Sequence, residues 1–144
     1  MMTVRRILEQ KGHTIWSVTP GATVYEALSV LADRNIGALM VLDGEKLVGV
    51  FSERDYARKV ALLKKTSRDT PVREVMSREV VSVGPDQSIV ECMDLMTDNH
   101  IRHLPVVEAG KPIGVVSIGD VVKAMLEEKE FLLEQMSKYI SGTR

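Results

Sequence analysis

The feature that most constrains the fold of this chain is an internal repeat. Shifting the sequence by 65 residues places segment 18–60 on segment 83–125 without a gap, and 12 of the 43 aligned positions are identical. Segments 4–8 (VRRIL) and 72–76 (VREVM) also resemble each other, so the lead-in to each copy is duplicated too. The chain is predicted to hold two copies of one unit, joined around residues 64–71. The two should share a core, because about 60 residues bury too little surface alone.

Each copy shows the same order of predicted elements. A short β-rich run ends at a turn-forming proline, and a helix with a Ser/Thr-x-x-Glu capping box follows it. Two apolar strands around a glycine-containing turn come next, and a second helix begins at a serine. The unit therefore reads β-α-β-β-α. In the two copies its segments are the runs 15–18 and 80–83, the helices opening at Thr23 and Ser88, the hairpins 38–51 and 104–116, and the helices opening at Ser52 and Ser117.

Three segments lie outside the repeated unit. Segment 3–10 has the apolar spacing of a short amphipathic helix, and the linker 64–71 is basic. The last helix is predicted to continue to about residue 140, with an apolar stripe that another surface must cover. The stripe consists of Leu126, Leu132, Leu133, Met136 and Ile140. The predicted organisation is an N-terminal helix with a lead-in strand (1–17), a first repeat (18–63), a linker with a short helix (64–79), a second repeat (80–125) and a helical extension (126–144).

The composition narrows the functional classes. Lysine and arginine number 19 and acidic residues 20, a net charge of −1 that disfavours nucleic acid as a partner. No apolar run approaches the roughly 20 residues that span a bilayer, and the N-terminus lacks the apolar core of a secretory signal. The single cysteine can form neither an internal disulfide nor a cysteine-based zinc site, and the histidines lack metal-ligand spacing. We expect a soluble cytoplasmic protein with no metal site and no membrane contact.

The motifs inside the repeat resemble those of a known family. The segments G-V-F-S-E-R-D (49–55), G-V-V-S-I-G-D (114–120) and R-H-L-P-V-V (102–107) are similar to paired cystathionine β-synthase (CBS) domains, also called Bateman modules. The resemblance extends over residues 4–125. It implies an α+β fold in which small mixed sheets are covered by helices and the two repeats are related by a pseudo-twofold axis. It also implies adenosine-containing ligands in two clefts between the repeats, and a flat homodimer.

The motif residues Ser117 and Asp120 have two interpretations. An S-x-x-D pattern at a helix start caps that helix without any ligand. A carboxylate there can also accept both hydroxyl protons of a ribose, while the hydroxyl and free N–H groups meet phosphate oxygens. The resemblance implies this second role, with the arginine and histidine of the cleft facing the phosphate and small residues leaving room for the adenine. The predicted lining is Thr19, Gly37, Ala38, Arg102, His103, Ser117, Gly119 and Asp120.

The motif of the first copy predicts a second cleft. Here Arg54 could supply the cation for the phosphate, because the first copy has no arginine–histidine pair ahead of its second strand. The alternative for Arg54 is a solvated helix residue. A larger ligand such as a dinucleotide could use this cleft. Its predicted lining is Ser52, Arg54, Asp55, Val83, His103 and Leu104.

We expect a regulatory binding module and not an enzyme. The sequence has no G-x-x-x-x-G-K-S/T phosphate loop and no nucleophile–base arrangement, and the two motif aspartates belong to separate clefts. AMP is the first ligand candidate, and ATP, NAD(H) and S-adenosylmethionine are the others. The module would report cellular energy or redox state to a separate effector protein. The main alternative is a ligand-independent dimerisation scaffold, and a weaker one is nucleic-acid binding through the basic linker and the Arg5-Arg6 region.

Overall fold

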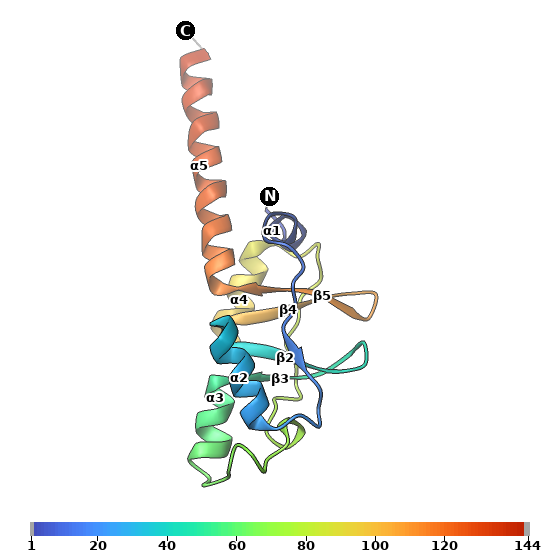
Figure 1. Ribbon diagram of the computed structural model, residues 1–144. Helices are drawn as coiled ribbons and strands as arrows, with labels where there is room; N and C mark the ends of the chain where they lie inside the picture. The colour runs from blue at the N-terminus through green and yellow to red at the C-terminus, as the bar shows by residue number, and fades with distance from the viewer. Residues whose placement is uncertain (1, 143–144) are drawn as a thin grey trace.

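The computed structural model describes residues 2–142, with side chains described through residue 140. Two small sheets stack on each other, and helices pack around them (Figure 1). One sheet has the strand order β1-β2-β3, and the other pairs β4 with β5. The sheets meet where β3 contacts β5. The predicted α+β class with tandem repeats is confirmed.

The first repeat follows the predicted order closely. The hydroxyl of Thr23 accepts a hydrogen bond from the Glu26 N–H at 3.1 Å, which caps the first helix, and Asn35 ends this helix in the left-handed region at φ 53°. The first strand runs parallel to the second, and the second and third form an antiparallel hairpin. The elements are β1 (Ser17–Val18), α2 (Val24–Arg34), β2 (Ala38–Asp43), β3 (Lys46–Ser52), α3 (Glu53–Tyr56) and the π-helical turn η1 (Ala57–Ala61).

The second repeat has the same order with one difference. Ser88 and Glu91 form the predicted capping box. The predicted strand at 80–83 is wrong, because only Val83 pairs, in a single parallel bridge to Val106. Val80 and Val81 turn toward a cleft instead of continuing along the sheet. The elements are α4 (Ile89–Asn99), β4 (His103–Glu108), β5 (Lys111–Ser117) and α5 (Ile118–Gly142).

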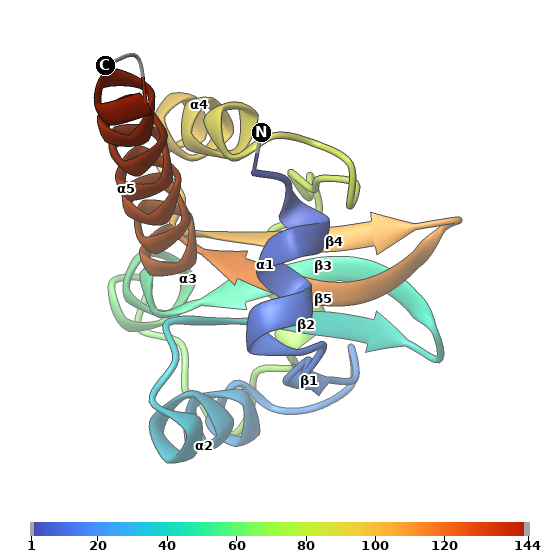
Figure 2. The ribbon, with the colours of Figure 1, turned by 90° about the horizontal axis from the view of Figure 1, so that it is seen from above.

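The two lead-in segments cross over between the repeats. Helix α1 (Val4–Lys11) precedes the first repeat but lies across β5 of the second repeat (Figure 2). The 3₁₀ turn η2 (Val72–Glu74) precedes the second repeat but belongs to the first repeat's core. The prediction of one shared core is therefore wrong in detail: each copy has its own core, and the other copy's lead-in completes it. The crossed apolar residues are Val4, Ile7 and Leu8 in one core and Val72, Val75 and Met76 in the other.

A glycine marks the contact of each crossed segment with its strand. A Cβ at Gly49 in β3 would lie 2.6 Å from Met76 Sδ and 3.1 Å from the Ser77 carbonyl oxygen. A Cβ at Gly114 in β5 would lie 2.7 Å from Leu8 Cδ2. A side chain at either position would displace the crossed lead-in: at Gly114 the end of the Leu8 side chain would have to shift, whereas at Gly49 the backbone of Ser77 is also close.

The last helix leaves the body of the molecule. In Figure 1, α5 starts at the second sheet and projects far beyond every other element. Val121 and Ala124 in its first turns are buried, whereas residues 131–140 are all exposed. The predicted apolar stripe is therefore uncovered in a single chain. Within residues 2–142, no helix combines the length and apolarity needed to cross a membrane.

We predict that Gly49→Ala lowers the free energy of unfolding by about 1–3 kcal/mol, because the added methyl group overpacks the contact with Met76 and Ser77. Urea denaturation followed by circular dichroism measures the change. Gly84→Ala is the matched control, since its Cβ would meet nothing closer than 4.0 Å. Equal stability of the two variants would show that the lead-in contact is loose.

Candidate functional site

Two adjoining clefts lie where the repeats meet. The small cleft, which contains Lys11, Trp16 and Ser117, has a volume of about 370 Å³. The large cleft, which contains Ser52 and Asp55, has a volume of about 900 Å³. Both volumes are in the range of small-molecule sites. The clefts share a wall made of Gly37, Ala38, Val50, His103 and Pro105.

Asp120 lies in the first turn of α5, behind the surface of the small cleft. Its Oδ2 accepts hydrogen bonds from the Ser117 N–H at 2.8 Å and from Lys11 Nζ at 2.6 Å. Its backbone N–H donates to Ser117 Oγ at 3.1 Å, so the motif does cap the helix. No hydrogen bond or ion pair from residues 2–142 uses Oδ1. This carboxylate therefore has an acceptor oxygen that is still available.

Lys11 influences the pKa values of two titratable groups near it, Asp120 and His103. Partial burial opposes the ionisation of Asp120, but the hydrogen bonds from Lys11 and Ser117 outweigh it and lower the pKa of this carboxyl. Burial lowers the pKa of His103, and the charges of Lys11 and Arg102 lower it further against the opposing effect of Asp120 and Glu53. These shifts favour a neutral imidazole in the cleft and an ionised carboxylate behind its surface.

The remaining wall of the small cleft is mainly apolar. Trp16 is 37% exposed, and Arg34 stacks on its ring with the guanidinium carbon 4.0 Å from the ring centroid. Ile36, Ala38 and Met40 line the cleft from the first repeat. This combination of a flat aromatic ring, aliphatic side chains and a polar end suits a planar base attached to a polar group.

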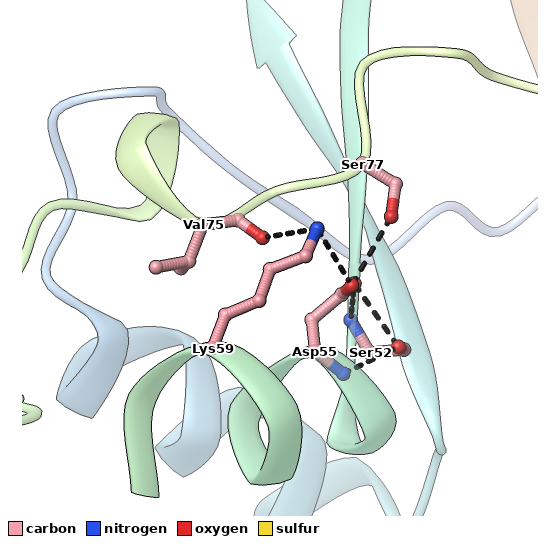
Figure 3. A network of polar contacts seen from close by, with 5 residues as sticks. All are labelled: Ser52, Asp55, Lys59, Val75 and Ser77. Carbon is pink, nitrogen blue, oxygen red and sulfur yellow. Dashed lines mark hydrogen bonds and ion pairs between the residues drawn. The ribbon is translucent and has the colours of Figure 1, made fainter. Parts of the chain in front are cut away.

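Asp55, the equivalent carboxylate of the first repeat, has a different environment (Figure 3). Its Oδ2 accepts from both the backbone N–H and the hydroxyl of Ser52 at 3.0 Å. Its Oδ1 accepts from Ser77 Oγ at 3.1 Å and pairs with Lys59 Nζ at 3.3 Å. Lys59 also donates to the Val75 carbonyl at 3.2 Å. Asp55 is buried, both of its oxygens are used, and the network ties α3 to the crossed lead-in.

The large cleft is rich in cations. Arg54, Arg58, Lys59 and Arg102 line it, together with the acidic groups Glu53, Asp55 and Glu79. Arg54 donates to the carbonyl of His100 at 3.1 Å, so it bridges the two repeats instead of being only solvated. Such a surface suits an anionic ligand longer than a monophosphate.

The structure brings together most of the predicted site residues. Gly37, Ala38, His103 and Ser117 line the small cleft, and Ser52, Arg54, Asp55 and His103 line the large one. Asp120, which was predicted to line the small cleft, lines neither cleft: it lies behind Lys11 and Ser117, to which it is hydrogen-bonded and which do line the small cleft.

Five further residues lie elsewhere than predicted. Arg102 lines the large cleft, because it follows the C-terminal end of α4, where Asn99 and the C-cap His100 line the same cleft. Strand alternation turns Leu104 into the core, opposite His103, and Val83 is buried beside it. The remaining two, Thr19 and Gly119, are exposed and line neither cleft.

Sequence reasoning missed Lys11 and Trp16. Both lie outside the repeated motifs, and Lys11 reaches the cleft only because α1 crosses to the second repeat. The repetition of VRRIL as VREVM was the one signal that this segment belongs to the unit.

Cys92 is buried in the core, and burial raises the pKa of its thiol to about 11. No group of three or more histidine, cysteine or acidic side chains that could hold a metal ion occurs among the described residues.

Comparisons with known proteins show the relationship of this chain to others. A family model described as the CBS domain matches residues 4–62 and 72–127. The mitochondrial CBS domain-containing protein CBSX3 of Arabidopsis thaliana is 37% identical over 150 residues, which cover 97% of this chain and 72% of the relative.

Two solved structures show the same fold. A protein with CBS domains from Burkholderia ambifaria MC40-6 is 48% identical, with a TM-score of 0.84 over 88% of this chain and 95% of that one. The CBS domain pair of protein MJ0100, solved in complex with 5-methylthioadenosine and S-adenosyl-L-methionine, is 25% identical, with a TM-score of 0.77 over 89% of this chain and 98% of that one.

The family match also decides the expectation about catalysis. CBS domain pairs are regulatory modules without catalytic activity, and the expectation that this chain is not an enzyme is confirmed. Two matched CBS domains account for nearly all of its residues, and the chain therefore belongs to the CBS domain family as a CBS domain pair.

Proposed function

We propose that this CBS domain pair senses an adenosine-containing ligand in the small cleft, with AMP as the first candidate. The observation that carries the proposal is the unused Oδ1 of Asp120 beside a cleft with an apolar wall. A ribose diol needs carboxylate oxygens that can accept two hydroxyl protons, and Asp120 has one wholly available oxygen. Support also comes from the MJ0100 pair, a relative solved with two adenosyl compounds.

The charged groups of the two clefts favour different ligands. In the large cleft Asp55 already has a partner on each oxygen, so it is a poor acceptor for a ribose. The arginines there instead favour the phosphate chain of ATP or of a dinucleotide such as NAD(H). S-adenosylmethionine, with its sulfonium cation, fits neither charge pattern as well as AMP does.

The output of such a sensor is binding to another protein. We propose that ligand occupancy reports energy or redox state to a separate effector, and that the protein acts in the cytoplasm as a homodimer. The apolar face of α5 supports the dimer: Val122, Leu126, Leu133 and Met136 are spaced by three, four or seven residues on one side of the helix and are 43–60% exposed.

A ligand-independent scaffold is the second candidate function. The observation in its favour is that both S-x-x-D motifs cap their helices without any ligand. If this alternative holds, neither cleft binds a nucleotide, and the protein functions only through association by the exposed face of α5. Ligand titration distinguishes the two functions directly.

Asp120→Ala is expected to weaken AMP binding by roughly ten- to a hundredfold, because a charge-assisted pair of hydrogen bonds to the ribose is lost. Calorimetry gives the affinity, and the fluorescence of Trp16, the chain's single tryptophan, reports occupancy of the small cleft. Asp120→Asn keeps one acceptor oxygen for the helix cap but removes the charge and the second acceptor, and exposed Asp98→Ala is the control. Undiminished AMP binding by Asp120→Ala would remove the assigned role of this carboxylate.

Asp55→Ala is expected to act on stability and not on AMP binding. Removing a buried carboxylate that holds Ser52, Ser77 and Lys59 should lower the free energy of unfolding by about 1–3 kcal/mol. Urea denaturation measures this loss, and the Trp16 response to AMP should remain at temperatures where the variant is folded. A variant as stable as the parent that no longer binds AMP would reverse the assignment of the two clefts.

Light scattering at micromolar concentration should give twice the mass of one chain. Leu133→Glu should shift the population toward monomer, because it places a charge in the apolar stripe of α5. Phe131→Glu is the matched control, since Phe131 is equally exposed but lies on the opposite side of the helix. A monomeric mass for the unaltered chain would contradict the dimer.

A further inference from the structure

Lys11 stands at the contact between the small cleft and Asp120. It is the one lysine or arginine among the described residues that line this cleft. Its ammonium group lies 2.6 Å from Asp120 Oδ2 and donates to the Val115 carbonyl at 3.0 Å. An ammonium group has three N–H donors, so these two contacts leave one for a further acceptor.

The position of Lys11 is fixed by the fold. Val4, Ile7 and Leu8 anchor α1 in the core of the second repeat, and the helix ends where the Gly12 N–H donates to the Leu8 carbonyl at 2.8 Å. Lys11 is the last residue of this anchored helix, so only its side chain needs to move. The ammonium can then leave Asp120 while the backbone stays in place.

Lys11 and a ribose diol compete for the same carboxylate. A diol that binds in bidentate fashion needs both oxygens of Asp120, and Lys11 holds one of them. A neutral nucleoside would have to weaken this ion pair and would offer the ammonium no anion in return. A nucleotide offers a phosphate, which gives the displaced ammonium a new partner that is also an anion. The cost of releasing Asp120 is then offset only for an anionic ligand.

We propose that Lys11 determines the ligand specificity of the small cleft by exchanging Asp120 for the phosphate of an adenosine 5′-phosphate. This inference rests on the proposed binding of adenosyl ligands in this cleft and adds the charge that the ligand carries. The exchange favours AMP over adenosine, and it disfavours S-adenosylmethionine, whose sulfonium is repelled by the ammonium.

Lys59, which pairs with the first-repeat carboxylate Asp55, shows why the exchange is proposed only for the small cleft. It is paired with Asp55, as Lys11 is with Asp120, but it is on the same helical segment, four residues away. Asp55 also accepts from Ser77, which has no counterpart at Asp120. Releasing Lys59 would leave Ser77 on Oδ1 and Ser52 on Oδ2 of Asp55, whereas releasing Lys11 leaves Asp120, among the described residues, with only the Ser117 N–H, on Oδ2. No ribose site is therefore gained at Asp55.

The test compares AMP, adenosine and S-adenosylmethionine as probes on the full chain and on Lys11→Met. Calorimetry gives each affinity, and Trp16 fluorescence assigns the binding to the small cleft. We expect the unaltered chain to prefer AMP over adenosine, and this preference to fall by about tenfold in Lys11→Met. AMP should bind more weakly to the variant, whereas adenosine should bind equally well or more tightly, because its competitor for Asp120 is gone.

Two further variants complete the design. Lys11→Arg keeps a cation at this position and should retain the preference for AMP. Lys111→Met removes one positive charge at the hairpin tips, where Lys111 pairs with Glu45, and should leave the preference unchanged.

The outcomes separate this inference from the proposed function. An AMP preference that falls by less than about threefold in Lys11→Met, or its absence in the unaltered chain, overturns the role of Lys11 while ligand binding stands. AMP and adenosine weakened by the same factor would indicate a structural role only, and would also overturn it. Failure of every probe to bind the unaltered chain overturns the proposed function itself.

Discussion

The crossing of the two lead-in segments holds this molecule together. About 60 residues of one repeat bury too little surface to be stable alone, and each repeat here obtains the missing apolar residues from the segment that precedes the other. Leu8 and Met76 fill the spaces over Gly114 and Gly49, where a side chain on the strand would prevent the contact. Neither repeat can move away from the other without losing part of its own core.

The same crossing gives the two motif carboxylates different environments. At Asp55 the crossed segment contributes Ser77, and a lysine of the same helical segment supplies the positive charge. At Asp120 the crossed segment is a full helix, and its last residue, Lys11, supplies the charge from a different element. The same sequence motif thus forms a fully bonded structural junction in the first repeat, and in the second it holds a carboxylate with one oxygen that has no partner among the described residues. The difference comes from the neighbours and not from the motif.

Interactions between residues close together in the sequence could be predicted, whereas those between distant residues could not. The caps at Thr23 and Ser88 and both hairpins follow from residues close together in the chain, and the structure has them as predicted. The crossing, and with it Lys11 at Asp120, joins residues 109 positions apart and has no local signature. The misplacement of Leu104 had a smaller cause: along a strand, a shift of one residue exchanges the cleft face for the core face. Arg102 precedes the strand and lines the large cleft with the end of α4.

The small cleft and the exposed end of α5 are connected by a single element. Ser117 and Asp120 form the first turn of a helix of 25 residues, which is about 37 Å long at 1.5 Å per residue. A ligand at a concentration of 100 times its dissociation constant stabilises the arrangement that it prefers by about 2.7 kcal/mol. The cleft has walls from both repeats and from α1, so this energy acts on the packing from which α5 emerges. Because a helix is stiff along its axis, a small tilt of its first turn moves the apolar face at the far end by several times as much. A sensor of the kind proposed would present its signal on α5 itself.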